Sequence, residues 1–310
     1  MKLLARVPKF DFMAQRKVGL LVSLTLTIAS VVLVLTRGLN LGIDFTGGVL
    51  VEVAYPQTVQ LEEVRDDLAA GGYHNAVAQY FGGSNVVLIR LPPAANASSA
   101  QVSTRILETL HAEERKVELR RIDFVGAAVG EELTDQGTTA LLIAFIGIFL
   151  YIMFRFQWKF SAGAIAALVH DALMAVGFLS LFQIEFDITT VAAILALIGY
   201  SNNETVVIFD RVRENLIGMR RAGIHEVVNL SVNQTLLRSI ITHLTTLLVC
   251  TALYFLGGPS VHSFSVTLIV GVIVATYSSI YVSTSFAVAL GISREDLLPP
   301  KLDEELDKTP

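Results

Sequence analysis

Residues 160–182 read FSAGAIAALVHDALMAVGFLSLF, and this stretch decides the fold. It is 23 residues long, and Asp171 is its only charged side chain. A helix needs about 20 consecutive apolar residues to cross the hydrocarbon core of a bilayer. The stretch therefore predicts a transmembrane helix.

Other stretches of the chain reach the same length and apolar character. They are residues 18–36, 136–154, 188–209, 236–256 and 264–290. The whole chain has 310 residues, of which 53% are apolar and only 16% are charged. An ordinary soluble protein has about 25% charged residues. We predict a polytopic α-helical membrane protein with six transmembrane helices.

Short connections that contain lysine and arginine alternate along the chain with connections that contain neither. Positive residues are retained on the cytoplasmic side of the membrane. Five precede the first span, two lie in 155–159 and four lie in 210–235, whereas 183–187 and 257–263 have none. Both termini are therefore predicted to be cytoplasmic, with an uncleaved signal anchor at the start. The expected domains are 1–36, a tail and the first helix; 37–135, an extracytoplasmic domain; 136–290, five helices with a cytoplasmic link at 210–235; and 291–310, an acidic cytoplasmic tail.

Segment 37–135 has the alternation of a small folded domain. Strand-like runs occur at 49–55, 77–81, 86–91 and 117–124. Helical runs near 58–70 and 98–114 separate the first from the second and the third from the last. The order βαββαβ predicts an α+β domain of the ferredoxin-like type. We interpret it as a structural or polypeptide-contacting domain, because nothing in it resembles a catalytic constellation.

Charged residues inside spans are costly, at about 2.5–3.5 kcal/mol on insertion scales, and they mark ion pathways or paired contacts. The candidates are Asp171, Glu204 and Arg238. By helical spacing, Glu204 and Arg238 each lie in a polar stripe. The supporting polar residues are Ser201, Asn202, Asn203, Thr205, Thr242 and Thr245.

Two interpretations of these charges are open. Because both spans enter from the cytoplasmic side, Glu204 and Arg238 could form an ion pair that switches in a proton relay. The pair could equally be static and fix helix register, and Asp171 could serve a relay or an interhelical hydrogen bond. His243 is interpreted as a packing or hydrogen-bonding residue.

Several classes of function lack sequence support. Motifs GxxxxGK[ST], HExxH and GxSxG are absent, so the chain is not expected to be an enzyme. One cysteine, Cys250, provides no metal or redox motif, and we expect no metal and no cofactor. The net charge of -5, without a basic stripe, argues against nucleic acid. Any work must draw on an external energy source such as the membrane potential, which supplies about 2.3 kcal/mol per charge per 100 mV.

Five segments, in order, carry a resemblance to a known family. They are GIDFTGG at 42–48, VGAAVGEEL at 125–133, His170-Asp171, GYSNNETVVIFDRVREN at 199–215, and RSIITHLTTL at 238–247. Together they resemble the SecF family of the bacterial Sec protein-export machinery, within the RND superfamily. The first segment also fits the sister subunit SecD.

The resemblance implies a proton-gradient-coupled auxiliary subunit of protein translocase in the bacterial cytoplasmic membrane, acting late in export. It implies a SecD-like partner, a SecY-type channel, exported unfolded polypeptides and protons. Glu204 and Arg238 match proton-pathway residues of the family. The family usually has Asp at position 204 and a small polar residue at 243, and both departures leave a polar group.

Two other functions fit part of the sequence. A small-molecule exporter of the RND type is one, although such chains generally have twelve spans. A passive assembly subunit, whose charges only hold helices together, is the other. Glu204→Gln separates the passive subunit from the two transporters.

Overall fold

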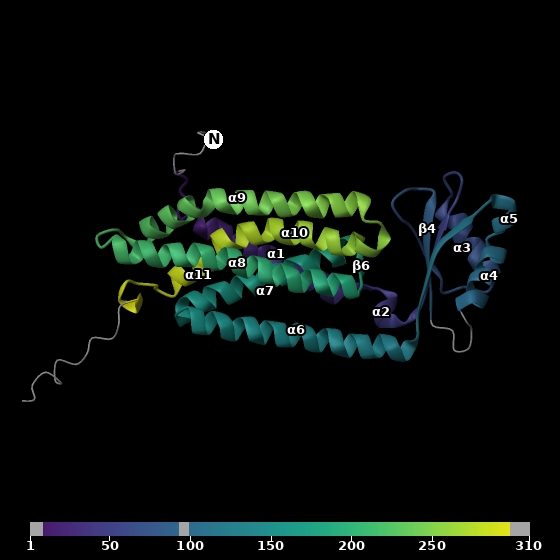
Figure 1. The fold of residues 1–310 in the computed structure, drawn as a ribbon, viewed down its shortest axis with the longest axis horizontal. Coiled ribbons are helices and arrows are strands. Elements are labelled where there is room, and N and C mark those ends of the chain that lie inside the picture. Colours follow the sequence, from purple (N-terminus) through teal and green to yellow (C-terminus); the bar gives the residue numbers. More distant parts are fainter. Residues whose placement is uncertain (1–8, 93–98, 298–310) are drawn as a thin grey trace, which may run out of the picture.

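The computed structural model describes residues 9–92 and 99–297 and consists of a long helical bundle with a small α+β domain at one end (Figure 1). Within these residues, six helices are long and apolar enough to cross a membrane, which confirms the prediction. They are α1 (Arg16–Arg37), α6 (Ala127–Arg155), α7 (Trp158–Phe182), α8 (Ile188–Gly218), α9 (Ile224–Leu256) and the last span, His262–Ala289.

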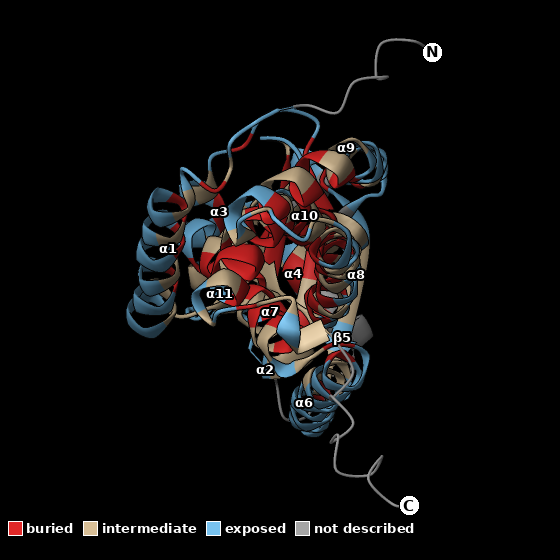
Figure 2. Ribbon diagram, turned by 90° about the vertical axis from the view of Figure 1, so that its left-hand side faces the viewer, coloured by how far each residue is buried: buried red, intermediate tan, exposed pale blue. Residues whose placement is uncertain are grey.

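The centre of the bundle is formed by α7, α8 and the last span, which are the most buried of the six. Figure 2 shows buried residues gathered at this centre and exposed residues on the outer faces of α1 and α6. The outer faces are apolar, with exposed side chains such as Leu35 and Phe154. Exposed apolar faces of this kind suit contact with lipid tails.

The last span is divided into three parts. It contains α10 (His262–Ser278), a π-helical turn η2 (Ser279–Ser283) and α11 (Thr284–Ala289). π-helical turns often occur at functional sites. This turn contacts α7 and α8 in the interior of the bundle.

The helices extend beyond the predicted spans. The predicted link 210–235 consists mostly of helix, because α8 continues to Gly218 and α9 begins at Ile224. Val212, Val228 and Val232 in this region are buried in the main core, so one face of each helix stays packed. At the opposite end of the bundle, α6 begins at Ala127, within the predicted domain 37–135. The acidic tail falls mostly outside the described residues.

The small domain contains β2 (Gly48–Ala54), α3 (Leu61–Ala70), β3 (Val77–Tyr80), β4 (Val86–Leu91), α4 (Ser99–Thr109), the short α5 (Ala112–Arg115) and β5 (Glu118–Val125). Its antiparallel strands lie in the order β3-β4-β2-β5. Alternate residues such as Val51 and Ile89 face α3 and α4, with which they form a core. The other face of the sheet turns toward the bundle (Figure 1).

Two short strands attach this domain to the bundle. β1 (Asn40–Leu41), just after α1, pairs in parallel with β6 (Glu185–Phe186), just before α8. The turn α2 (Ile43–Thr46) follows and packs against the start of α6. A Cβ at Gly130 on α6 would lie 2.9 Å from the backbone nitrogen of Gly47, so glycine permits this approach.

Candidate functional site: a buried polar cluster

One face of α8 carries polar residues into the core of the bundle. Ser201, Glu204 and Thr205 are 0%, 7% and 1% exposed, respectively. Residues three and four apart lie on one side of a helix, and this side faces α7, α9 and α10. Asn203, one residue before Glu204, is exposed on the other side. The predicted stripe around Glu204 is therefore an interior one.

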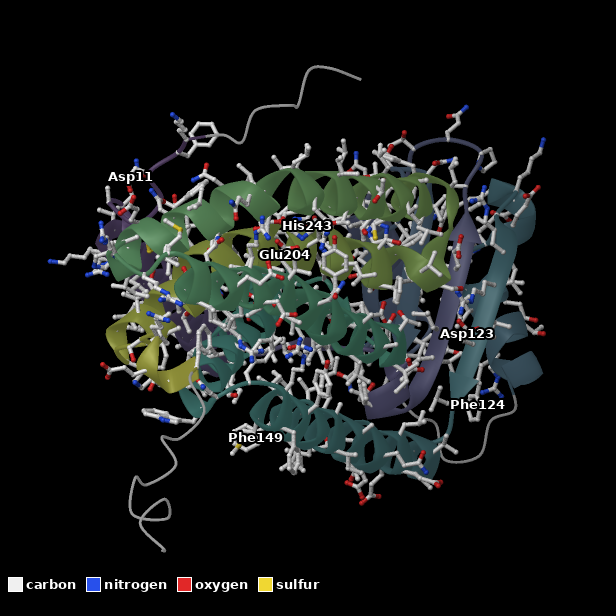
Figure 3. All side chains as sticks on the ribbon, turned by 60° about the vertical axis from the view of Figure 1, so that its left-hand side comes forward. Asp11, Asp123, Phe124, Phe149, Glu204 and His243 are labelled. Carbon is white, nitrogen blue, oxygen red and sulfur yellow. The ribbon has the colours of Figure 1, made fainter. Side chains whose placement is uncertain are left out.

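Glu204 faces two residues of α9. The Ser239 hydroxyl donates a hydrogen bond to Oε1 of Glu204. Nε2 of His243 lies 3.7 Å from the other oxygen, Oε2. Glu204 and His243 face one another in Figure 3. The carboxyl group is thus shared by α8 and α9 in the interior.

The imidazole of His243 is fixed on its other sides. Its Nδ1 lies 2.8 Å from the hydroxyl of Thr276 on α10. Its ring packs against the ring of Tyr200 on α8, with 5.3 Å between the centroids. His243 is 4% exposed, so it belongs to the interior of the bundle.

Arg238 occupies a different face of α9. No ion pair among the described residues joins it to Glu204, so the predicted pair is not formed within the chain. Arg238, Thr242 and Thr245 are all exposed. Neighbouring residues of a helix point about 100° apart, and it is Ser239, not Arg238, that points at α8. The stripe of Arg238, Thr242 and Thr245 forms an outer polar face of α9.

Asp171 lies at a junction of three helices and is 1% exposed. Its Oδ2 accepts hydrogen bonds from Ser201 on α8 at 2.5 Å and from Ser278 on α10 at 2.8 Å. Its Oδ1 lies 2.9 Å from Nδ1 of His170. The two interhelical hydrogen bonds are the contacts predicted as one of the two roles of Asp171.

Asp171 and Glu204 belong to one continuous polar region. Ser201, which binds Asp171, lies one helical turn before Glu204. Thr205, next to Glu204, lies 3.3 Å from the hydroxyl of Ser279 in the π-helical turn. The region therefore contains two buried carboxyl groups, two histidines and several hydroxyl groups. Such groups can bind and pass protons, and the part of the chain described contains no group of three or more potential metal ligands.

A second polar cluster joins the outer domain to the bundle. Arg90 on β4 lies 2.9 Å from the Glu185 carboxylate and donates to Oδ1 of Asn40 at 2.9 Å and to the carbonyl of Leu41 at 3.0 Å. Burial raises the pKa of Glu185, and Arg90 opposes this shift. Asp44 accepts a hydrogen bond from the backbone of Ile188, the first residue of α8. The start of α8 is thus tied to the base of the outer domain.

The sequence interpretation did not assign Ser239, His243 or Ser278 to the site. It described His243 as a packing or hydrogen-bonding residue and left the two serines unassigned. The signal for the first two was a second stripe on α9, since Ser239 and His243 are four residues apart and share a face with Thr235. For Ser278 the signal was the serine-rich run at 278–285 in the last span. Short hydroxyl residues gather where helices approach closely in membranes.

The six spans, the attached α+β domain and the buried carboxyl groups define a polytopic membrane protein with a polar centre inside its bundle. Two family models match the chain: "Protein export membrane protein SecD/SecF, C-terminal" over residues 105–293, and "SecD/SecF GG Motif" over residues 32–59. The second includes the turn α2.

Relatives align over nearly the full chain. The protein translocase subunit SecF of Pseudomonas aeruginosa is 45% identical over 305 residues, covering 98% of this chain and 99% of the relative. That of Haemophilus influenzae is 41% identical and covers 98% and 93%. A crystal structure of SecDF from Thermus, described as a translocon-associated membrane protein, matches with a TM-score of 0.84 and 38% identity. It covers 94% of this chain, whereas this chain covers 39% of that structure's chain. The chain belongs to the SecF family of protein translocase subunits.

Proposed function

We propose that this chain is an auxiliary subunit of the Sec protein translocase that, paired with a SecD-like subunit, uses the proton gradient to promote late steps of protein export. Glu204 and Asp171 bind protons within the bundle, and Arg238 acts from the outer face of α9. The site residues predicted from sequence thus have separate positions, two interior and one peripheral.

The observation that carries this proposal is the burial of Glu204 between α8 and α9. A carboxyl group in the interior of a membrane bundle is expensive to keep, and such residues are functional by default. Its partners are a hydroxyl and an imidazole, which accommodate both the charged and the protonated carboxyl. A change of protonation therefore changes what binds α8 to α9.

The exposed polar residues on the outer face of α9 are an argument for a partner subunit. Arg238, Thr242 and Thr245 are exposed there among apolar residues such as Ile241 and Leu248. An arginine inside a span that faces lipid is costly, and a protein partner with a carboxylate removes this cost. Since the chain covers 39% of the SecDF structure, we assign this face to a SecD-like subunit.

The distribution of positive residues supports an orientation. The start of α1 and the end of α11 lie at the end of the bundle opposite the outer domain (Figure 1). Arg155, Lys159 and Arg211 lie toward this same end, which we assign to the cytoplasm of a bacterium. The outer domain is then extracytoplasmic, beside a SecY-type channel, where it contacts unfolded polypeptides as they emerge.

The test is protein export into inverted membrane vesicles with an imposed proton gradient. Wild type is compared with Glu204→Gln and Arg238→Ala at equal abundance. Loss of the gradient-dependent stimulation in both variants is expected. Unchanged stimulation in both would contradict the proposal and leave a passive assembly subunit as the function.

A further inference from the structure

One ring nitrogen of His243, Nε2, is left without a hydrogen bond in the interior of the bundle that the structure describes. This atom is buried and has no hydrogen-bond partner among the described residues. The nearest carboxyl oxygen is Oε2 of Glu204 at 3.7 Å. A buried polar atom without a partner costs free energy comparable to a lost hydrogen bond. The arrangement therefore needs an explanation beyond packing.

The hydrogen bonds of Thr276 determine which nitrogen of His243 carries hydrogen. The Thr276 hydroxyl lies 2.8 Å from the carbonyl oxygen of Val272 and 2.8 Å from Nδ1 of His243. A hydroxyl has one hydrogen, and a carbonyl can only accept. Both contacts are satisfied when the hydroxyl donates to Val272 and Nδ1 donates to the hydroxyl. In the neutral imidazole Nε2 then carries the lone pair and faces Glu204.

A lone pair on Nε2 and an ionised Glu204 would repel each other. One proton between them removes the conflict, either as Oε2–H facing Nε2 or as Nε2–H⁺ facing a carboxylate. An N–H···O bond spans about 2.7–3.2 Å, and a small rotation of the Glu204 side chain closes the remaining gap. The transfer breaks an O–H bond and forms an N–H bond, so the pair keeps its total charge.

We propose that His243 is a further proton-binding group of the site, and that Glu204 and His243 titrate as a coupled pair sharing a proton between Oε2 and Nε2. This deepens the function proposed above and rests on it for its role in export. His243 acts on the transported proton itself and also positions Glu204.

The surroundings of the pair contain few other groups that titrate. From α8, Tyr200 packs on the imidazole ring. From α10, the group that faces His243 is Thr276, which does not titrate. On α9 itself, Arg238 lies on the exposed face, and its positive charge acts on Glu204 without forming an ion pair with it. Asp171 is separated from the pair by the turn of α8 between Ser201 and Glu204.

The experiment follows the infrared carboxyl absorption of Glu204 against pH, in membranes that contain the full chain with its partner. The signal is assigned by its loss in Glu204→Gln. His243→Gln removes the titrating ring and keeps an amide that can hydrogen bond to Thr276. Cys250→Ser is the matched control, because Cys250 is buried two turns further along α9.

In wild type and in Cys250→Ser, the Glu204 signal is expected to disappear in two steps, because strongly interacting groups titrate as a pair. In His243→Gln it should disappear in one step, with its midpoint displaced by about one pH unit or more. Identical curves for wild type and His243→Gln would overturn the proposal. If His243→Gln does not accumulate, Thr276→Val must displace the curve by releasing Nδ1, and an unchanged curve overturns it equally.

The same membranes separate this inference from the proposed function. If Glu204 titrates in two steps but export is not stimulated by the proton gradient, the coupled titration of Glu204 and His243 is supported and the proposed function is contradicted. One-step titration in wild type with gradient-dependent export contradicts the pair alone. When both hold, His243→Gln should also remove one of two steps from the pH profile of gradient-dependent export.

Discussion

Arg90→Ala tests how much the Arg90 side chain contributes to fastening the outer domain to the bundle. Arg90 projects from β4 of the outer domain, whereas Glu185 lies in β6 at the start of α8, and their charged atoms are 2.9 Å apart. The same guanidinium binds Asn40 and the carbonyl of Leu41 in β1. The substitution removes all three contacts and leaves the partly buried Glu185 carboxylate without a charged partner.

The magnitude follows from the exposure of the pair. Breaking a fully buried pair costs about 3–5 kcal/mol, and both side chains here are 16% exposed. Solvent reaching them lowers the cost to roughly 2 kcal/mol, within the range for hydrogen bonds to charged groups. Since 1.4 kcal/mol is a factor of ten, local opening of the β1–β6 pairing should become about 30-fold more frequent.

Hydrogen–deuterium exchange of the Gly42 amide measures this opening, because that amide donates to the carbonyl of Phe186 at 2.8 Å. Arg120→Ala is the control. Arg120 is 53% exposed, and its guanidinium lies as far as 4.0 Å from the carboxylate of Glu52, so this ion pair is expected to contribute little. Exchange in Arg90→Ala within twofold of wild type would refute the reasoning.

The pH dependence of the exchange provides a second test of the same variant, because its direction can be predicted. Burial raises the pKa of Glu185 above its ordinary value of 4.5. A group with a raised pKa in the folded state contributes stability fully below its ordinary pKa and loses it as the pH rises through the raised value. Arg90 lowers the pKa of Glu185, so in Arg90→Ala this pKa rises further, and the uncompensated charge is present only above the higher value. The difference in exchange between variant and wild type should therefore narrow on acidification, and a widening difference would contradict the assignment.

Two further predictions concern packing and the last described segment. Gly177→Ala should lower the thermal unfolding temperature in detergent, because a Cβ there collides with Ser30 of α1 and overpacking costs about 1–3 kcal/mol. The control Gly147→Ala, where a Cβ meets nothing within 4 Å, should not lower it, because alanine favours the helix over glycine. Asp296 is partly buried, which raises its pKa, but hydrogen bonds from Lys159 and Ser293 outweigh this and lower it below 3.8. Its contribution to stability is thus full above pH 3.8 and lost as the pH falls through the lowered value; protease cleavage near 293–297 should increase only in that acid range, and cleavage that increases from neutral pH downward would contradict it.

The spans could be predicted from sequence because a run of about 20 apolar residues has few stable fates other than a membrane helix. The strands of the outer domain could be located because apolar residues recur at every second position, as at Val49, Val51 and Val53, which line one face of a sheet. The ends of α8 and α9 could not. In these segments polar residues outnumber the apolar ones that pack in the core. Val212 in α8 and Val228 in α9 each lie four residues from another core residue of the same helix.

The site was predictable in composition and not in geometry. Glu204 and Asp171 are recognisable because a charge in an apolar run is expensive. Which face of α9 turns inward is decided by the packing of three helices, and the charge of Arg238 drew the interpretation to the outer face. Ser239 and His243 are ordinary polar residues until α8 is placed beside them.

The measurement that tests the central claim most directly is gradient-stimulated export in Glu204→Gln and Glu204→Asp at matched abundance. Gln keeps the shape and the hydrogen bond to Ser239 and removes the titrating proton, whereas Asp keeps the proton with one methylene less. If Glu204 passes protons, Glu204→Asp retains gradient stimulation and Glu204→Gln loses it. Equal stimulation in the two variants would contradict a proton-binding role for Glu204.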